Sequence, residues 1–484
     1  MLTIAALLAV TITADFNEKV GAIRPELHGS GFGPTICSCP QANIDIINEM
    51  GFSSTRTHDW ALLNENERVC DYFHIFPLLH RDPKDPANYV FGPTDYLLNR
   101  VREELTGKNL LFRLGTSIEH SGPKVHFNSL IPDEKDFDTI AESFAATVRH
   151  YNKGWANGHE WGIKYWEIWN EPDGRNNMWC LPSDDTTPAN AAEGKRQVLF
   201  AKFFAKCLKR LKSEFPEEKV GGPALCSLKK PYFTALFEAC KKEGVKPDFI
   251  SWHQYTCDPE NIKRCATEAR KLCDSHGLKD CEIILDEWHY LGREYNGFAG
   301  LRSADKKQRK LAWTGPGSHN GIDSSCFNLV VLSGIQTSPL DRAYYYGCRM
   351  VGSWGAIDAM RNKYKVFYGL KLFGDLVRDY KTICSSKSDS KPAKMGYQVS
   401  SFAVKSEDGR KMALLVSDFR SKAKELSIEV KGVPEGAKAR AWVHDYTRDM
   451  EEVPVEVGAD GKFTFTKADD NSAALFVEFS LPQE

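Results

Sequence analysis

The chain has 484 residues, of which 42% are hydrophobic and 26% are charged. This composition is typical of a globular protein, and the length favours one large domain accompanied by a small one. The 63 Lys and Arg residues nearly balance the 65 Asp and Glu residues, which argues against a nucleic acid or an acidic membrane as a partner held by bulk charge.

The first segment, Met1–Ala9, is apolar and carries no positively charged residue. Two interpretations are open. It is either the end of a signal peptide with cleavage near Ala14, or the start of a strand that continues through Thr13. The location of the protein, exported or cytoplasmic, stays equally open. Residues 1–26 are thus a signal remnant or a strand that belongs to a β-sandwich. No other segment is long and apolar enough to span a bilayer.

Short apolar segments alternate with longer amphipathic ones from residue 27 to about residue 375, the pattern of a parallel α/β fold. Eight strands are predicted: Leu27–Phe32, Ser53–His58, Leu110–Gly115, Tyr165–Glu171, Val220–Ala224, Phe249–Tyr255, Glu282–Glu287 and Met350–Ile357. We therefore expect a (β/α)8 TIM barrel over residues 27–384. A doubly wound sheet would need a Gly-rich phosphate turn after an early strand, and Gly29–Gly33 lacks its spacing.

The character of the sequence changes after a polar stretch. Residues 385–394, which begin Ser-Ser-Lys-Ser-Asp-Ser, have the composition of a linker. Residues 395–484 alternate apolar and polar residues with period two, and turns such as Asp408-Gly409 and Asp460-Gly461 separate several of the segments. This pattern predicts a β-sandwich.

The 14 cysteines form no CxxC pair. Five of them, Cys207, Cys226, Cys240, Cys281 and Cys348, lie in apolar segments where a buried free thiol is expected. Cys37-Ser38-Cys39 is the one tight pair, and it permits a disulfide more readily than a zinc site. We predict no metal ion.

Two of the predicted strands end in acidic residues, and these indicate the type of reaction. Ile168-Trp169-Asn170-Glu171-Pro172 closes an aromatic strand with a carboxylate, and Pro172 prevents the strand from continuing. The later segment from Glu282 ends in Asp286 and Glu287. In a barrel these ends meet on one face. Two carboxylates placed there supply the groups that cut a glycosidic bond.

The two carboxylates have different expected roles. Glu287 is the ionised nucleophile, and Glu171, flanked by Trp169 and Asn170, is the acid/base. Adjacent strand residues point to opposite faces, so only one of Asp286 and Glu287 is expected to face the barrel axis. Glu287 shares parity with Ile283 and Leu285, and we predict that it faces the axis. Asp286 then points away or is held by the backbone or a neighbouring base.

Further polar and aromatic residues lie at the other strand ends. Arg56 and His58 share one strand face, as do His253 and Tyr255. Each is alternatively an ordinary core or barrel-closing residue, and only their joint occurrence points to a site. The predicted substrate-binding residues are Arg56, His58, Asn170, His253, Tyr255 and Trp354.

With these residues in view, the chain resembles glycoside hydrolase family 39, a retaining group that contains β-xylosidases and α-L-iduronidases. Trp166–Pro172 is similar to the acid/base strand of that family, Val220–Ala224 to its fifth strand and Asp248–His253 to its sixth. Glu287 falls at the nucleophile position, and Arg56-Thr57-His58 matches the second strand. The resemblance runs from about residue 27 to the end, because the family carries a β-sandwich after the barrel.

The resemblance implies a retaining exo-glycosidase that needs no cofactor. A β-D-xyloside is the first expected substrate and an α-L-arabinoside the second. An α-L-iduronide is the third, since its carboxylate needs a basic anchor for which only Arg361 or Lys363 is available. The alternative from another class is a barrel that binds carbohydrate without cleaving it. Gly292–Ser325 departs from the family pattern as a long insertion expected to overhang the site.

Overall fold

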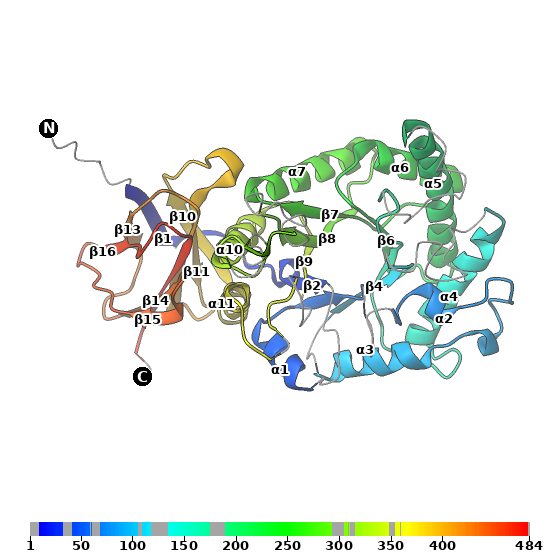
Figure 1. The fold of residues 1–484 in the computed structure, drawn as a ribbon, viewed down its shortest axis with the longest axis horizontal. Helices are drawn as coiled ribbons and strands as arrows, with labels where there is room; N and C mark the ends of the chain where they lie inside the picture. The colour runs from blue at the N-terminus through cyan, green and yellow to red at the C-terminus, as the bar shows by residue number, and fades with distance from the viewer. Residues whose placement is uncertain are drawn as a thin grey trace.

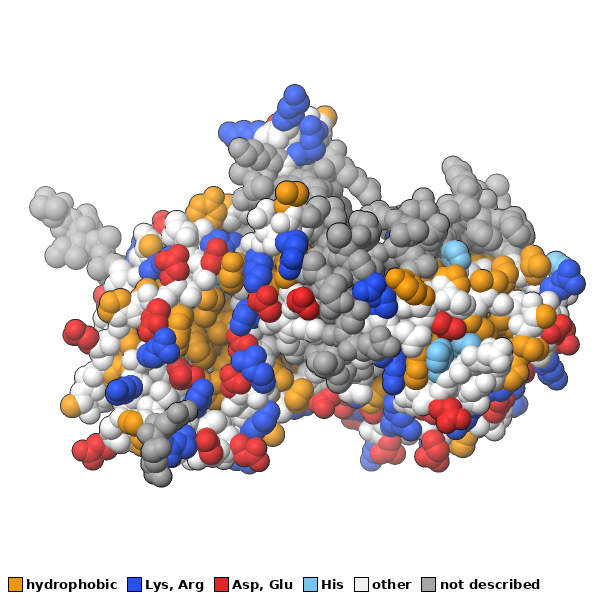
Figure 2. Space-filling view, turned by 90° about the horizontal axis from the view of Figure 1, so that it is seen from below, with side chains coloured by type: hydrophobic (Ala, Val, Ile, Leu, Met, Phe, Trp, Pro, Cys, Tyr) orange, Lys and Arg blue, Asp and Glu red, His pale blue; other side chains and the backbone are white. Residues whose placement is uncertain are grey.

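The computed structural model describes residues 9–31, 41–58, 60, 68–104, 109–117, 134–174, 189–292, 304–307, 309, 315–347, 354–358 and 360–482. A helix-covered barrel and a smaller all-β unit lie side by side (Figure 1), and the first and last described strands both belong to the β unit. The face in Figure 2 carries basic and acidic side chains interspersed over the described surface, in keeping with the net charge of −2.

Eight strands form a closed parallel barrel, which confirms the predicted TIM barrel. They are β2 (Gly29–Gly31), β3 (Ser54–Arg56), β4 (Asn109–Leu114), β5 (Tyr165–Ile168), β6 (Lys219–Leu225), β7 (Phe249–Thr256), β8 (Glu282–Tyr290) and β9 (Arg342–Tyr346). The barrel closes where β2 pairs with β9, with Gly29 opposite Tyr344.

The last barrel strand lies earlier in the chain than predicted. It is Arg342–Tyr346 and not Met350–Ile357, where Ile357 makes only an isolated bridge to Lys363 within the described residues. The buried side chains of Tyr344 and Tyr345 anchor β9 in the barrel. Composition favoured the wrong segment because Arg342–Tyr346 contains no aliphatic residue larger than alanine.

Helices surround the barrel in the usual alternation with its strands (Figure 1). They are α1 (Gln41–Glu49), α2 (Tyr72–Ile75), α3 (Gly92–Glu104), α4 (Phe137–Lys153), α5 (Ala189–Glu214), α6 (Lys230–Glu243), α7 (Pro259–Ser275), α10 (Ile322–Ile335) and α11 (Lys365–Asp379). Within the described ranges, none of them combines the length and the apolar character that a bilayer crossing requires. One apolar core fills the space between these helices and the strands.

The barrel interior is layered. Leu111, Tyr165, Phe249, Ile284 and Tyr344 form a separate apolar cluster. Two residues further along three of these strands come Glu167, Ser251 and Asp286, all fully buried. Because side chains alternate along a strand, these polar groups lie directly above the apolar layer. They form the floor beneath the carboxyl ends of the strands.

The smaller unit is a nine-stranded sheet that curls on itself. Its order is β15-β14-β17-β12-β11-β10-β1-β13-β16. The strands are β1 (Ala9–Ala22), β10 (Thr382–Ser388), β11 (Gln398–Lys405), β12 (Lys411–Phe419), β13 (Glu425–Lys431), β14 (Lys438–His444), β15 (Asp449–Val453), β16 (Lys462–Thr466) and β17 (Ala473–Ser480). The rings of Phe16 on β1 and Phe479 on β17 lie 5.9 Å apart although these strands are not neighbours. This face-to-face packing is that of the predicted β-sandwich.

Strand pairing decides two of the expected boundaries, one as an expected alternative and one against expectation. Ala9–Ala22 forms a strand between β10 and β13, so the strand interpretation of the N-terminal segment holds from residue 9 onward. Residues 385–388 of the predicted linker belong to β10, which pairs with β1 and β11. A Ser-rich composition resembles a linker, but here pairing with β1 satisfies backbone hydrogen bonds of these residues.

Helix α10 joins the two units. Twelve of its fourteen residues are buried, which fits an apolar helix covered on all sides. Ser417 of the sandwich donates a hydrogen bond to the carbonyl of Cys326 at 3.0 Å, and Ser472 donates to Asp323 at 2.6 Å. The sandwich therefore holds a barrel helix in place.

The prediction of a buried free thiol is confirmed for Cys207, Cys240 and Cys281, whereas Cys226 is a free thiol that is only partly buried. Cys348 and the pair Cys37 and Cys39 lie outside the described residues, as does much of the Gly292–Ser325 insertion.

Candidate active site

Glu287 lies at the carboxyl end of the barrel and is 5% exposed. The Tyr255 hydroxyl donates a hydrogen bond to its Oε1. Its Oε2 lies 3.2 Å from a guanidinium nitrogen of Arg56 and 3.8 Å from Nε2 of His58. The structure thus brings three predicted binding residues to one carboxylate, and each of them can donate to it.

A β-bulge in β8 places Glu287 and Asp286 on the same side. Trp252 of β7 pairs with Leu285 and the next residue, His253, pairs with Glu287, so Asp286 is the extra residue. The carboxylates of Asp286 and Glu287 each lie 3.2 Å from Arg56. A bulge of this kind re-aims side chains, and such bulges are frequent beside active sites.

The prediction that only one of the two acids can face the axis is therefore wrong. Ile284 lies in the interior cluster, whereas Ile283 and Leu285 pack toward the helices. Asp286 continues the inward row of Ile284 by ordinary alternation, and the bulge then turns Glu287 inward as well. Asp286 is held by neighbouring bases, which was one of its two expected states.

Glu171 follows the end of β5 in a strained backbone. Its φ is 43°, and that of Trp169 is 76°. Non-glycine residues in this region cost free energy and concentrate at functional sites. The Glu171 N–H donates to the carbonyl of Ala224 at 2.8 Å, which fixes the turn. The Trp169 ring packs against Tyr72 and Phe203 at 5.9 Å and 5.5 Å, toward the surrounding helices. This differs from the expectation that Trp169 flanks the Glu171 carboxyl.

His253 links the two predicted catalytic acids. Its Nδ1 lies 2.7 Å from Glu171 Oε1, and its Nε2 lies 3.5 Å from Glu287 Oε2 and 3.3 Å from Asp286 Oδ2. Burial lowers the pKa of His253, but the charges of Glu287, Asp286 and Glu171 raise it well above its usual value. A protonated imidazole can donate toward carboxylates on both sides.

One oxygen each of Glu171 and Glu287 and a nitrogen of His253 lie within 4.8 Å of one another. Such a set is also chemically able to ligate a metal ion. A protonated His253 places positive charge at the same point, between the two acids. The close approach of the carboxylates is the central geometric fact of the site.

The pKa values of the buried acids diverge. Burial raises the pKa of Glu287 to about 7, and the charge of Glu171 adds to this while His253, Arg56 and Tyr255 oppose it. Burial also raises the pKa of Glu167 to about 7 against the effect of Arg56. For Asp286 burial raises the pKa, but Arg56 and His253 outweigh it and leave the pKa below its usual value.

Arg56 connects the whole group and is fully buried. Its Nε donates to Glu167 at 2.7 Å, and its other nitrogens donate to Asn170 Oδ1 at 2.8 Å and Glu287 at 3.2 Å. Ser251 donates to the second oxygen of Glu167 at 2.7 Å. Sequence reasoning missed Glu167 and Ser251, although Ser251 lies two residues before the predicted His253 and Glu167 lies four residues before the predicted Glu171. The alternation of side chains along a strand could have found them.

Removing the Arg56 charge should destabilise the fold strongly. Arg56→Met leaves Glu167 and Asp286 buried without their cation, and breaking a buried ion pair in this way costs about 3–5 kcal/mol. Denaturant unfolding measures the loss. Arg264→Met is the matched control, because the Arg264 side chain is 62% exposed and pairs with Asp258 at the surface. Equal losses for the two variants would contradict the buried network.

Aromatic rings form one wall of the site. Trp354 lies 5.5 Å from Tyr255 and 5.6 Å from Tyr346, measured between ring centroids. His289 and His319 approach the same indole at 4.9 Å and 4.7 Å. Trp354 comes after β9 and not from a barrel strand, yet it reaches the predicted site. Tyr346, His289 and His319 were not predicted.

His58 lies beside this wall, with its ring 6.3 Å from that of Tyr346. Burial, with the nearby Arg56 charge, holds the pKa of His58 well below its usual value. A neutral imidazole in this position offers one donor and one acceptor, which suits sugar hydroxyls as well as a carboxylate.

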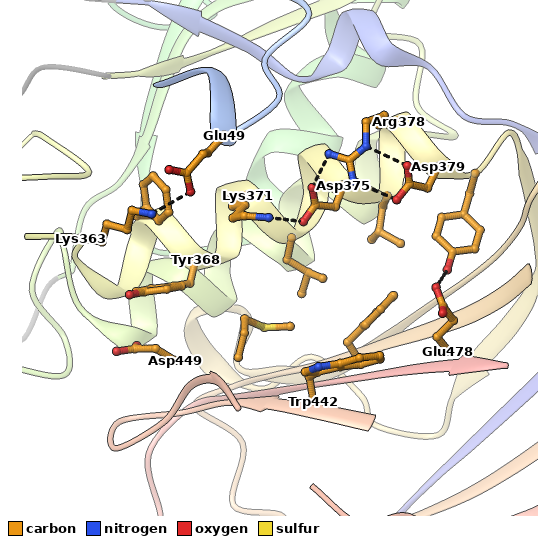
Figure 3. Close-up of a pocket in the computed structure, with 16 residues that line it drawn as sticks. Glu49, Lys363, Tyr368, Lys371, Asp375, Arg378, Asp379, Trp442, Asp449 and Glu478 are labelled. Carbon is orange, nitrogen blue, oxygen red and sulfur yellow. Dashed lines mark hydrogen bonds and ion pairs between the residues drawn. The ribbon is translucent and has the colours of Figure 1, made fainter. Parts of the chain in front are cut away.

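A hollow of about 370 Å³ lies between α11 and the sandwich, away from these acids (Figure 3). Lys363 lies there and pairs with Glu49 at 2.7 Å. It is therefore engaged outside the barrel mouth, contrary to its suggested role as a uronate anchor. Arg361, the other suggested anchor, is exposed beside it.

Comparisons with known proteins fit this geometry. Residues 44–274 match the model of glycosyl hydrolases family 39, a segment that contains Arg56, Glu171 and His253. A β-xylosidase from Caldicellulosiruptor saccharolyticus is 26% identical over 217 residues, 44% of this chain and 38% of that protein. One from Geobacillus stearothermophilus is 28% identical over 124 residues, 25% of this chain and 21% of that protein. The matches thus span well under half of either relative.

Solved structures share the fold over nearly the whole chain. A glucosidase from Croceicoccus marinus superposes with a TM-score of 0.71 at 18% identity, covering 98% of this chain and 100% of that one. A family 39 enzyme from Xanthomonas axonopodis pv. citri gives 0.65 at 14% identity, covering 98% of each chain. The matched segment, the closed barrel and the appended sandwich agree, and over residues 44–274 the chain is similar to the glycosyl hydrolases of family 39.

Proposed function

We propose that the protein is a retaining glycosidase with Glu287 as nucleophile and Glu171 as acid/base. The approach of their carboxylate oxygens to within 4.8 Å carries the proposal. Retaining enzymes hold their carboxyl groups about 5–5.5 Å apart, whereas inverting enzymes need roughly 6.5–9.5 Å to admit a water molecule. The short span favours direct attack by one carboxylate on the sugar.

The different environments of Glu287 and Glu171 support different catalytic roles for them. Glu287 is buried and receives donors from Tyr255 and Arg56, which favour the ionised form that attacks the anomeric carbon. The Glu171 side chain is 14% exposed, nearer the mouth. It protonates the departing oxygen as the glycosidic bond breaks and the bond to Glu287 forms. It then takes a proton from the water that releases the sugar, and Glu287 returns as a carboxylate.

Asn170 provides a donor for the sugar. Its Oδ1 accepts from Arg56, which can only donate, so the amide orientation is fixed. Its Nδ2 is buried and has no hydrogen-bond partner within the described residues. Because an unmade hydrogen bond at a buried group is costly, a sugar hydroxyl that accepts from Nδ2 gains binding energy. His58 and Trp354 lie on other sides of the same space.

The substrate we propose is a β-D-xyloside, with an α-L-arabinoside second. The two β-xylosidase relatives support the first choice. The engagement of Lys363 by Glu49 removes one of the two anchors that an iduronide would require. The proposals of exo action and of a pentose as the sugar rest on the resemblance to the family. The catalytic roles proposed for Glu171 and Glu287 do not depend on these two points.

A panel of nitrophenyl glycosides tests the proposal, with xyloside, both arabinosides, glucoside and iduronide. We expect the xyloside to be cleaved with the highest kcat/KM, and proton NMR to show that the first product has the anomeric configuration of the substrate. An inverted first product would contradict the nucleophile assignment. Binding of xylo-oligosaccharides without cleavage of any glycoside would identify a non-catalytic carbohydrate-binding barrel.

The pH dependence should report Glu287. Its pKa of about 7 means that the attacking carboxylate is lost as the pH falls below that value. We expect kcat/KM for an aryl glycoside to drop about tenfold per pH unit on that side. In Tyr255→Phe a donor that lowers this pKa is gone, so the acid limb should move to higher pH. The exposed Tyr446→Phe is the control, and an unmoved limb in Tyr255→Phe would contradict the assignment.

A further inference from the structure

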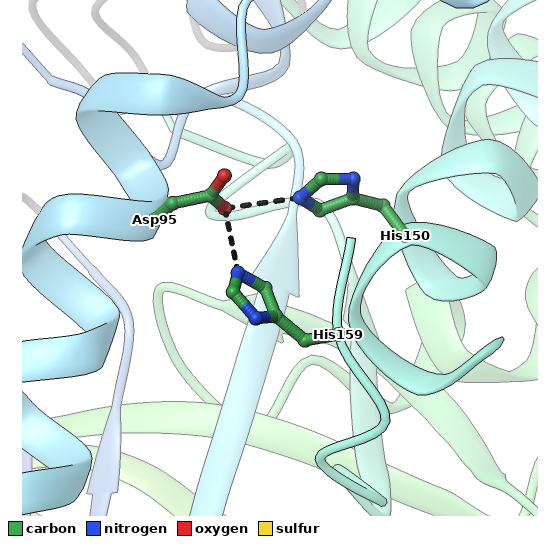
Figure 4. A group of neighbouring side chains, drawn as sticks. All are labelled: Asp95, His150 and His159. Carbon is green, nitrogen blue, oxygen red and sulfur yellow. Dashed lines mark hydrogen bonds and ion pairs between the residues drawn. The ribbon is translucent and has the colours of Figure 1, made fainter. Parts of the chain in front are cut away.

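A second cluster of ionisable groups lies outside the barrel mouth. Asp95 stands in the first turn of α3, His150 in the last turn of α4, and His159 in the segment that leads to β5 (Figure 4). His150 Nε2 lies 3.0 Å from Asp95 Oδ1, and His159 Nε2 lies 3.7 Å from the same oxygen. One atom from each of the three residues falls within 4.8 Å of the other two.

The hydrogen bonds of His150 determine its tautomer, and therefore which ring nitrogen presents a lone pair to the Asp95 carboxylate. Its Nδ1 lies 2.9 Å from the carbonyl oxygen of Trp155, and a carbonyl can only accept, so Nδ1 carries the ring proton. In the neutral ring Nε2 then directs a lone pair at Asp95. The Nε2 of His159 is buried and has no hydrogen-bond partner within the described residues. Three electron-pair donors converge, and a cation between them satisfies all three.

The spacing fits a zinc ion. Zinc binds histidine nitrogen and carboxylate oxygen at about 2.0–2.2 Å in tetrahedral geometry, which places neighbouring ligand atoms roughly 3.3–3.5 Å apart. The two distances from Asp95 Oδ1, 3.0 Å and 3.7 Å, lie on either side of this value. Small side-chain adjustments would equalise them.

We propose that Asp95 Oδ1, His150 Nε2 and His159 Nε2 bind one zinc ion, with water as the fourth ligand. The bond from His150 Nδ1 to the Trp155 carbonyl is the supporting contact that metal-bound histidines usually make. The ion ties α3 and α4 to the segment that precedes β5. Its role is to brace the outside of the barrel, separate from the catalytic acids.

Both imidazole rings are already held in place. His150 stacks on Phe91 with ring centroids 3.6 Å apart, and His159 stacks on Trp161 at 4.0 Å. Gly158 allows the segment to approach α4, because a Cβ at this position would lie 2.1 Å from the His150 carbonyl oxygen. Preorganised ligands lose little entropy on binding, which favours affinity.

Zinc chloride titration of the chelator-treated full chain tests the proposal. We expect a tightly bound ion at this site and a rise in Tm of about 2–3 °C at a free zinc concentration 100-fold above Kd. Asp95→Asn keeps the shape and an acceptor but removes the anionic ligand. His159→Gln removes a ligand from a partly exposed position. Each should weaken zinc binding at least about 100-fold, beyond the loss typical of a supporting contact.

Two controls separate this site from others. His276→Gln changes a histidine on the surface near the end of α7 and should bind zinc as the wild type does. Glu171, His253 and Glu287 form the other candidate ligand set in the described part of the chain, so Glu171→Gln should retain the zinc-dependent rise in Tm. Circular dichroism verifies that Asp95→Asn and His159→Gln fold. No rise in the wild type, or an equal rise in Asp95→Asn and His159→Gln, would overturn the proposal and leave a histidine–aspartate ion pair.

Discussion

Glu287→Ala should lower kcat/KM for an activated aryl glycoside by about 10⁴-fold or more, because removing the nucleophile of a concerted catalytic group costs nearly the whole rate enhancement. Glu287 is the acid that the Tyr255 hydroxyl and Arg56 hold at the barrel mouth. Azide should restore part of the activity, since a small anion fits the vacated space and attacks the anomeric carbon. The product is then a glycosyl azide, which NMR detects.

The bulge in β8 makes Asp286→Ala the necessary comparison. Both carboxylates lie 3.2 Å from Arg56, so proximity to the cation does not distinguish them. Asp286 is fully buried in the polar layer beneath the mouth. Its removal should lower the free energy of unfolding through the lost buried ion pair with Arg56, without azide rescue. Glycosyl azide from Asp286→Ala and none from Glu287→Ala would reverse the assignment.

The sequence predicted those site residues whose position depends on local chain geometry. β5 ends at Ile168, and Glu171 lies in the turn that follows, where Pro172 prevents a strand from resuming. The parity of Arg56 with His58 and of His253 with Tyr255 also depends only on alternation. Arg56, His58, His253 and Tyr255 all come together around Glu287 in the structure.

Asp286 shows where local reasoning fails. A bulge is a property of two paired strands, and nothing in residues 282–290 alone states that Trp252 and His253 of β7 pair with Leu285 and Glu287. The strand Arg342–Tyr346 was missed for the same reason. Its pairing with β2 and β8 outweighs its weak apolar pattern, and this pairing cannot be deduced from the segment alone. Trp169 likewise turned outward because its positive φ breaks the alternation that places Glu167 inward.

Glu171→Gln should separate substrates by their leaving groups. A general acid matters most when the departing oxygen is a poor leaving group, because protonation then removes the developing charge. Hydrolysis of xylobiose should fall about 10²–10⁴-fold, the usual contribution of a positioned acid. The first step with a dinitrophenyl xyloside, whose leaving group needs no proton, should stay near the wild-type rate.

The second step should slow for every substrate, because Glu171 must also activate water. Dinitrophenyl xyloside should therefore give a burst of phenolate, and mass spectrometry of the quenched protein should find the sugar attached to Glu287. Equal losses on both substrates with no trapped intermediate would make Glu171 a binding or structural residue.

The same variant also tests the electrostatic coupling of the two acids. The charge of Glu171 helps to raise the pKa of Glu287 to about 7. Glutamine has no charge, so the pKa of Glu287 should fall and the acid limb of kcat/KM for the dinitrophenyl substrate should move below pH 7. Glu142→Gln is the control, since Glu142 lies on α4 and pairs with Arg149 and Arg210 on the outside of the barrel. Its profile should match that of the wild type. An acid limb that stays in place in Glu171→Gln would contradict the electrostatic coupling, because a charged Glu171 so close to Glu287 must raise its pKa.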